Sequence, residues 1–154
     1  LKSNLYGEHA IGDQRIRKGT VINFFVDRAL AEETLTVYEP GTQSRNFVHV
    51  KDIARVYLRS AERLREQLAA GVTGAETYEI ASDEDPSVME MAQPVRDIAS
   101  EERNLDPAVE LVENPRGNET LVSDFAVDTS RARAELGWEP KHSVESTVRS
   151  LLAE

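Results

Sequence analysis

Segments with a helical spacing of apolar residues alternate along this chain with short segments of period-two spacing, and this alternation constrains the fold most. The helical segments begin near residues 20, 52, 87, 129 and 143. The strand-like segments cover residues 1–6, 35–38, 45–50, 77–81 and 108–112. Residues 8–19 mix charges with two glycines, and we interpret them as a surface loop. Helices and strands that alternate in this way indicate a mixed α/β fold.

The longest helical segment has the clearest pattern. Its apolar residues step along one face by four, four, three and four positions, and they are Ile53, Tyr57, Ala61, Leu64 and Leu68. Asp52 is the expected N-cap of this helix, and Gly71 is a natural stop. No glycine-rich turn joins a strand to a helix in the sequence, so a complete dinucleotide-binding half is excluded.

The charge balance excludes several classes of protein. Among 154 residues, 18 are basic and 28 are acidic, which gives a formal net charge of −10. We therefore expect no nucleic-acid partner and no docking on an anionic membrane. The sequence has no apolar run long enough to span a membrane and no signal-peptide pattern, and we expect a cytoplasmic protein. Cysteine is absent and the three histidines lack ligand spacing, so no metal site is expected.

Two further features bear on the source and the completeness of the chain. Arginine outnumbers lysine 14 to 4, and glutamate outnumbers lysine 19 to 4. A carboxylate-rich surface with little lysine suits concentrated salt, which indicates a halophilic source. An ordinary acidic cytosolic protein is the alternative. The chain begins at Leu1 rather than at methionine, so we also expect a piece of a longer polypeptide.

Two arginines stand outside the helical charge pattern. Arg45 follows a turn directly, and Arg116 lies in a turn-rich segment between proline and glycine. A guanidinium group matches phosphate oxygens in a bidentate way, so both side chains are candidates for holding an anion. Salt bridges to the plentiful carboxylates are the alternative. His49 alternates with apolar residues, and we interpret it as a packed strand residue.

Three motifs resemble a known family. They are V-Y-E-P-G-T-Q-S-R-N-F-V-H-V-K-D-I-A (residues 37–54), N-L-Y-G (residues 4–7) and L-G-W-E-P (residues 136–140). In their order and spacing along the chain, these motifs resemble those of extended short-chain dehydrogenases/reductases. This family comprises the NAD-dependent nucleotide-sugar epimerases and dehydratases and includes UDP-galactose 4-epimerase. The resemblance covers essentially the whole chain.

The resemblance implies a division of labour between two regions. In the family, a Rossmann region carries the glycine-rich NAD loop and a catalytic Tyr-x-x-x-Lys pair, and a C-terminal region binds the sugar nucleotide. None of the four tyrosines here is followed by lysine four residues later. We therefore expect residues 1–154 to be a single C-terminal substrate-binding region, with residues 1–7 as the end of the Rossmann part. We expect no catalytic residue in it, and NAD bound mainly by the other half.

Site roles are implied in the same way. Asn4 corresponds to an asparagine that hydrogen-bonds the diphosphate, and Leu5 lies where the backbone passes the nicotinamide. Thr20 and Val21 correspond to the start of a helix whose N-terminus faces the substrate. The strand that lies against the nucleobase corresponds to Leu35, Val37 and Tyr38.

The implied diphosphate clamp consists of Arg45 and Arg116, which is the role that their placement in the sequence also suggested. Glu119 stands where the family has a ribose-binding aspartate. Asn46 replaces an aspartate beside Arg45, and Glu39 replaces a glycine. These departures leave the identity of the nucleotide open.

We therefore expect the sugar-nucleotide-binding part of an NAD-dependent epimerase or dehydratase, whose partner is a nucleotide-diphosphate sugar. One alternative is a stand-alone, non-catalytic binding module with the same fold. Another is a dehydrogenase or reductase that acts on a non-nucleotide substrate. Apolar faces that pack on another half would be uncovered in this piece, so we expect a homodimer or self-association of the fragment.

Overall fold

A computed structural model describes residues 4–115 and 127–153 of the chain. Its elements, in chain order, are β1 (Asn4–Tyr6), β2 (Glu8–Ile11), β3 (Gln14–Arg17), α1 (Val21–Leu30), β4 (Leu35–Tyr38), β5 (Phe47–His49), α2 (Val50–Ala69), α3 (Val88–Arg103), β6 (Val109–Val112), α4 (Ser130–Leu136) and α5 (Val144–Ala153). The predicted mixed α/β class is confirmed. No helix in the described ranges is long and apolar enough to cross a membrane.

The strands form three separate pairs. β1 pairs with β5 in parallel, β4 pairs with β6 in parallel, and β2 pairs with β3 as an antiparallel hairpin. The hairpin corrects the expectation of a loop over residues 8–19. Its sequence shows no apolar alternation because all but a few of its side chains face solvent. A backbone ladder and an ion pair between Arg17 and Glu8 at 3.6 Å hold it instead.

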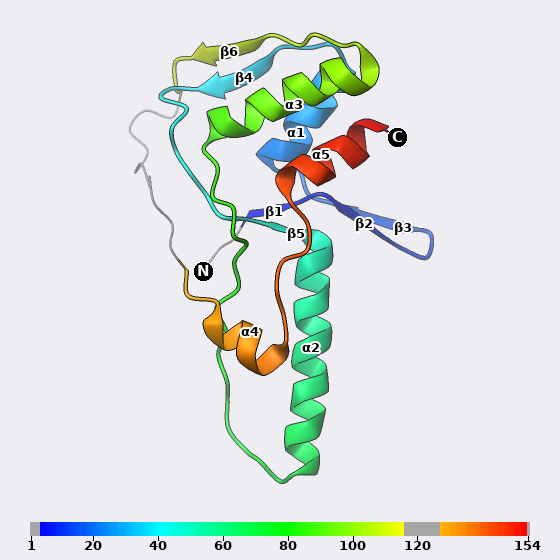
Figure 1. Ribbon diagram of the computed structural model, residues 1–154, viewed down its shortest axis with the longest axis vertical. Coiled ribbons are helices and arrows are strands. Elements are labelled where there is room, and N and C mark those ends of the chain that lie inside the picture. Colours follow the sequence, from blue (N-terminus) through cyan, green and yellow to red (C-terminus); the bar gives the residue numbers. More distant parts are fainter. Residues whose placement is uncertain (1–3, 116–126, 154) are drawn as a thin grey trace.

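The main core lies between the β4–β6 pair and the three helices α1, α3 and α5 (Figure 1). Each helix buries one apolar stripe, as amphipathic spacing requires. Ser87 begins α3 with a capping box, in which its side chain and that of Glu90 each accept from the other's backbone N–H. The largest fully buried side chains of this core are Tyr6, Phe25, Ile22, Leu35, Met91 and Leu152.

A smaller core attaches α4 to the start of α2. Val48, Ala132, Leu136 and Trp138 form it, and Leu5 is among the half-buried residues packed against it. Beyond this core α2 extends away from the body of the molecule (Figure 1). A long segment returns from the end of α2 to α3.

Two local predictions were wrong. The N-cap of α2 is His49 rather than Asp52, because the His49 Nδ1 atom accepts from the backbone N–H of Lys51 at 3.1 Å. Asp52 lies inside the first turn and makes tertiary contacts instead. Residues 77–81 are extended but belong to no strand of the described chain. Tyr78 anchors that segment through its hydroxyl, which donates to Glu76 and Glu135.

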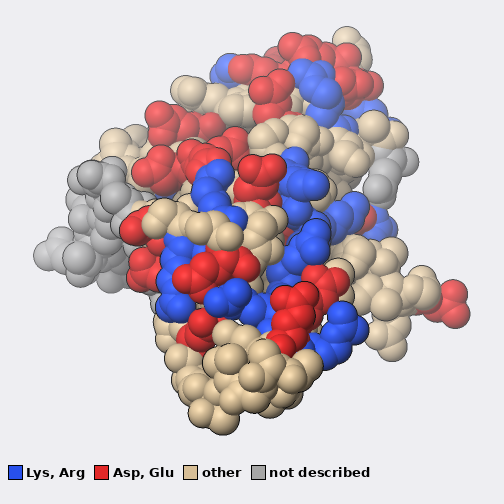
Figure 2. All heavy atoms as spheres, turned by 60° about the horizontal axis from the view of Figure 1, so that its bottom comes forward, with Lys and Arg blue, Asp and Glu red and all other residues tan. Residues whose placement is uncertain are grey.

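The outer half of α2 is fixed by charges rather than by apolar packing. The Arg63 guanidinium lies 2.7 Å from Glu76 and 2.9 Å from Glu135 of α4, and Arg131 pairs with the same two carboxylates. Figure 2 shows basic and acidic side chains interleaved above an uncharged tip, which is formed by residues 69–75. This network joins α2, α4 and the segment between them at a solvent-exposed surface, where ion pairs respond to salt.

Beyond Ile53, which packs against the small core, the apolar stripe that predicts α2 is not covered within the described residues. Tyr57 is 74% exposed, Leu64 is 55% exposed and Leu68 is 67% exposed. A hollow of about 480 Å³ opens beside Leu64 and Leu68. Exposed apolar faces of this kind are typical of surfaces that another polypeptide covers.

We expect the isolated chain to self-associate through this stripe. The double variant Leu64→Glu with Leu68→Glu should shift it to a monomer, because two charges would then have to be buried in the contact. Sedimentation velocity over a concentration series measures this. Leu30→Glu is the matched control, since Leu30 is 44% exposed at the far end of α1. A wild-type chain that stays monomeric at all concentrations would contradict the expectation.

Candidate functional site

A cavity of about 520 Å³ lies where β1, the N-terminus of α1, the end of β4 and the start of β5 meet. Five residues singled out in the sequence line it, and they are Asn4, Thr20, Val21, Tyr38 and Arg45. The remaining lining residues are Gly19, Phe24, Phe25, Thr36, Gln43, Phe47 and Val88. One turn, the N-terminus of α1 and the ends of three strands therefore converge on a single hollow.

Arg45 is the cation of this cavity. Its Nη1 atom donates to the carbonyl oxygen of Ser44 at 2.8 Å. Within the described ranges no carboxylate lies within salt-bridge distance of its guanidinium, so the salt-bridge alternative finds no support there. Most other described arginines pair with a carboxylate, as expected in a chain of net charge −10. The remaining guanidinium donors of Arg45 are available to an anion.

The N-terminus of α1 forms another wall. Thr20 occupies the N-cap with extended backbone, at φ −94° and ψ 168°, but its side chain makes no capping hydrogen bond. The first turn of α1 carries no acidic residue. Its backbone N–H groups and helix dipole are therefore not offset by a local carboxylate. Thr20 Oγ1 is buried and has no hydrogen-bond partner in the described structure.

Aromatic rings form the apolar part of the cavity. Tyr38, at the end of β4, is 43% exposed, and Phe24, on α1, is 45% exposed. The Arg28 guanidinium lies 5.3 Å from the centre of the Phe24 ring and holds it from outside the cavity. A flat apolar ring system next to a cation and a helix N-terminus suits a ligand with one planar and one anionic part.

The other predicted site residues lie elsewhere. The side chains of Leu35 and Val37 are fully buried in the main core, so only the backbone of β4 can face a ligand there. Leu5 packs against the small core around Trp138. Arg116 and Glu119 lie outside the described residues.

Asn46, which departs from the family pattern, has a structural explanation. Its Nδ2 donates to the carbonyl oxygens of Ser82 at 3.0 Å and Glu84 at 3.2 Å, and its Oδ1 accepts from the backbone N–H of Ser82 at 3.0 Å. An aspartate could not donate either of the first two bonds. Asn46 therefore fixes the segment that leads into α3, directly beside Arg45.

Sequence reasoning missed Gln43 and Phe24. Gln43 lies within the family-like stretch, two residues before Arg45, but nothing in its spacing singles it out. Phe24 falls off the buried stripe of α1, and that position could have signalled an exposed ring. The described residues hold no group of three side chains that could bind a metal ion.

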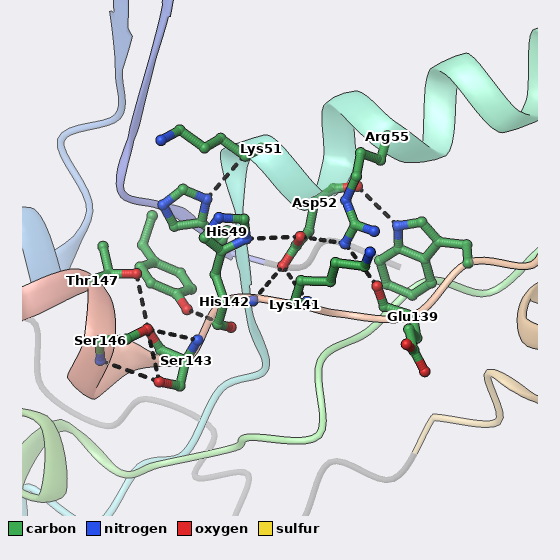
Figure 3. Close-up of polar contacts among 12 residues, drawn as sticks. His49, Lys51, Asp52, Arg55, Glu139, Lys141, His142, Ser143, Ser146 and Thr147 are labelled. Atoms are coloured by element: carbon green, nitrogen blue, oxygen red, sulfur yellow. Dashed lines mark hydrogen bonds and ion pairs between the residues drawn. The ribbon is translucent and has the colours of Figure 1, made fainter. Parts of the chain in front are cut away.

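A second polar cluster surrounds Asp52 at the start of α2 (Figure 3). The carboxylate of Asp52 is fully buried and accepts from the backbone N–H groups of Lys141 at 3.0 Å and His142 at 3.1 Å. It also accepts from Arg55 at 2.5 Å and contacts the His142 Nδ1 atom at 2.9 Å. Burial alone raises the pKa of Asp52, but these hydrogen bonds outweigh it and hold the pKa below its usual range.

His49 lies next to this carboxylate and stacks on His142. Their ring centres are 4.2 Å apart and nearly parallel, and the edge of the Tyr6 ring contacts His49 from another side. Gly7 leaves the room for the imidazole, because a Cβ there would lie 2.1 Å from Nε2. Burial, followed by the nearby His142, lowers the pKa of His49 to about 4. Neutral His49 can cap α2 through Nδ1, which matches its interpretation as a packed residue.

Comparison with known proteins identifies the family of the chain. Residues 2–81 match the model of the NAD dependent epimerase/dehydratase family, and the chain belongs to that family. It is 31% identical to UDP-glucuronic acid decarboxylase 3 of Arabidopsis thaliana over 90% of this chain and 34% of that protein. It is 28% identical to dTDP-glucose 4,6-dehydratase of Xanthomonas campestris over 95% of this chain and 38% of that protein. The chain thus spans about a third of the length of these curated relatives.

Solved structures show the same fold. UDP-glucuronic acid 4-epimerase of Bacillus cereus, in complex with UDP-glucuronic acid and NAD, superposes with a TM-score of 0.67 at 18% identity. The match covers 97% of this chain and 41% of that one. UDP-glucose 4-epimerase of Thermotoga maritima, with UDP-glucose, gives a TM-score of 0.65 at 21% identity, over 97% of this chain and 42% of that one.

The His49 environment generates a pH prediction. The folded state favours neutral His49, whereas the unfolded chain binds a proton below pH 6.5. The contribution of neutral His49 to the free energy of unfolding is therefore full above pH 6.5. It falls as the pH drops toward 4, by up to about 3 kcal/mol. His49→Asn keeps a capping acceptor but removes the titration. Urea unfolding from pH 4 to 7.5 should show a smaller loss for the variant. Equal pH profiles for the two proteins would contradict the prediction.

Removal of the Asp52 charge should destabilise the fold. In Asp52→Asn, an amide nitrogen would face N–H donors, and Arg55 would lose its carboxylate partner while keeping the carbonyl oxygen of Glu139. We expect the free energy of unfolding to drop by about 3 kcal/mol. Chemical denaturation at pH 7 measures this. Asp97→Asn is the control, because Asp97 pairs with Arg96 at an exposed position of α3. A loss no larger than that of the control would overturn the structural role of Asp52.

Proposed function

We propose that this chain is the substrate-binding part of an NAD-dependent nucleotide-sugar epimerase or dehydratase, and that the cavity beside Arg45 holds the substrate diphosphate. The observation that carries the proposal is Arg45, a cavity-facing guanidinium without a carboxylate partner within the described residues of a strongly acidic chain. The N-terminus of α1, with no acid in its first turn, supports the same ligand charge.

The shape of the cavity favours a nucleotide over a simple anion. Arg45 and Thr20 supply the polar part, and Tyr38 supplies an aromatic face for a base. The names of the relatives refer to UDP-sugars and a dTDP-sugar, so the proposed base is a uracil or a thymine. Arg116 as a second clamp and Glu119 at the ribose belong to the proposal by resemblance alone.

The residues of this chain do not form a dinucleotide site by themselves. The sequence has no glycine-rich strand-to-helix turn and no Tyr-x-x-x-Lys pair. NAD, when bound by the whole enzyme, would accept and return a hydride. Leu5 is the residue of this chain proposed to lie near it. The contribution of the chain is to bind and orient the sugar nucleotide, which is a separable part of catalysis.

Arg45→Met should weaken UDP binding roughly 10- to 100-fold, because a charge-assisted, bidentate contact to phosphate is lost. Isothermal titration calorimetry with UDP in low salt measures the change. Arg65→Met is the matched control, since it removes the same charge from the exposed face of α2, away from the cavity.

Two outcomes would contradict the proposal. A wild-type chain that binds neither UDP nor inorganic pyrophosphate would not be a diphosphate-binding region. Equal losses in Arg45→Met and Arg65→Met would mean that only net charge matters and that the cavity is not the site.

A further inference from the structure

Gln43 lines the cavity, and its side-chain oxygen is a hydrogen-bond acceptor without a partner in the described structure. Its Nε2 donates to the carbonyl oxygen of Tyr38 at 3.4 Å. Its Oε1 is buried and has no hydrogen-bond partner in the part of the chain that the structure describes. Buried acceptors are nearly always satisfied in folded proteins, because desolvation without a partner is costly. An oxygen left in this state on a cavity wall is therefore matched by a donor that arrives with a ligand.

The backbone around Gln43 is fixed independently of its side chain. The backbone N–H of Val88 donates to the carbonyl oxygen of Gln43 at 3.2 Å, and that of Met89 donates to Gly41 at 3.0 Å. Gly41 has φ 74°, and a Cβ there would lie 3.1 Å from Val37 and 3.2 Å from Leu111. The turn is thus held from behind by the start of α3 and by the core. The amide therefore sits in a set position without needing its own oxygen for support.

The position of this oxygen defines what it can recognise. Gln43 lines the cavity together with Tyr38, which offers the aromatic face, and Arg45, the cation of the cavity. A ligand whose anionic part meets Arg45 brings its planar part toward Tyr38 and the Gln43 amide. Because Nε2 already faces the Tyr38 carbonyl, the free group of the amide is an acceptor. It requires an N–H donor on the edge of the ring.

We propose that Gln43 is a specificity-determining residue that accepts a hydrogen bond from the ring N3–H of a uracil or thymine base. This inference rests on the proposed function and deepens it. Uracil and thymine share the N3–H donor, whereas N3 of cytosine is an acceptor. Gln43 selects the base, and Arg45 binds the phosphates.

A comparison of three ligands tests the two roles separately. Titration calorimetry is performed on the wild type, Gln43→Met and Arg45→Met with UDP, N3-methyl-UDP and inorganic pyrophosphate. The wild type should bind UDP roughly 3- to 10-fold more tightly than N3-methyl-UDP, the range for one neutral hydrogen bond. Gln43→Met should lose that preference and keep its pyrophosphate affinity within about twofold. Arg45→Met should weaken both UDP and pyrophosphate.

The outcomes distinguish this inference from the proposed function. If the wild type binds neither UDP nor pyrophosphate, both fail. If the wild type binds UDP and N3-methyl-UDP equally well, Gln43 does not recognise N3–H, while the diphosphate site stands. This comparison needs no variant and therefore holds even if a substitution impairs folding. If Gln43→Met weakens UDP and pyrophosphate alike, the residue only supports the turn and the inference is overturned.

Discussion

The buried carboxylate of Asp52 joins segments that lie 90 residues apart in the sequence. It sits in the first turn of α2, where the helix dipole favours a negative charge, and it accepts from the backbone at residues 141 and 142. The Trp138 indole N–H donates to the Asp52 carbonyl oxygen at 2.9 Å, and the Tyr6 hydroxyl donates to the carbonyl oxygen of His142 at 3.2 Å. The entry into α5 is thereby fixed to β1 and to the start of α2, which follows β5 directly, and both β1 and β5 border the cavity.

The distribution of arginine explains how such an acidic chain can keep a site for anions. Arg63 and Arg131 pair with Glu76 and Glu135 at one end of the molecule, and Arg149 pairs with three carboxylates at another. These groups compensate one another locally. The cavity combines Arg45 with a helix N-terminus that has no acid in its first turn. The local electrostatic potential of the cavity is therefore positive, although the net charge of the chain is negative.

Apolar spacing predicted α1, α2, α3 and α5 to within a few residues, because each buries or presents one continuous stripe, and α4 was predicted from its cap residues and Gly137. The hairpin of β2 and β3 escaped prediction because backbone pairing, not burial, maintains it. His49 and Asp52 are both polar residues near a helix start, and only contacts with residues 138–142 decide which one caps it. Arg45 could be selected from sequence because it follows a turn and stands outside the helical charge pattern. Gln43 could not, since a free Oε1 is a property of packing in three dimensions.

The exposed stripe of α2 and the isolated β1–β5 pair have one physical explanation. Parallel strands are normally buried on both faces, and α2 continues directly from β5. In the described structure this parallel pair has no further strand beside it, and much of the apolar face of α2 is exposed, which indicates a surface built to pack on further polypeptide. The chain spans about a third of the length of its curated relatives. The proposed binding cavity borders this strand pair, because Asn4 of β1 and Phe47 of β5 both line it.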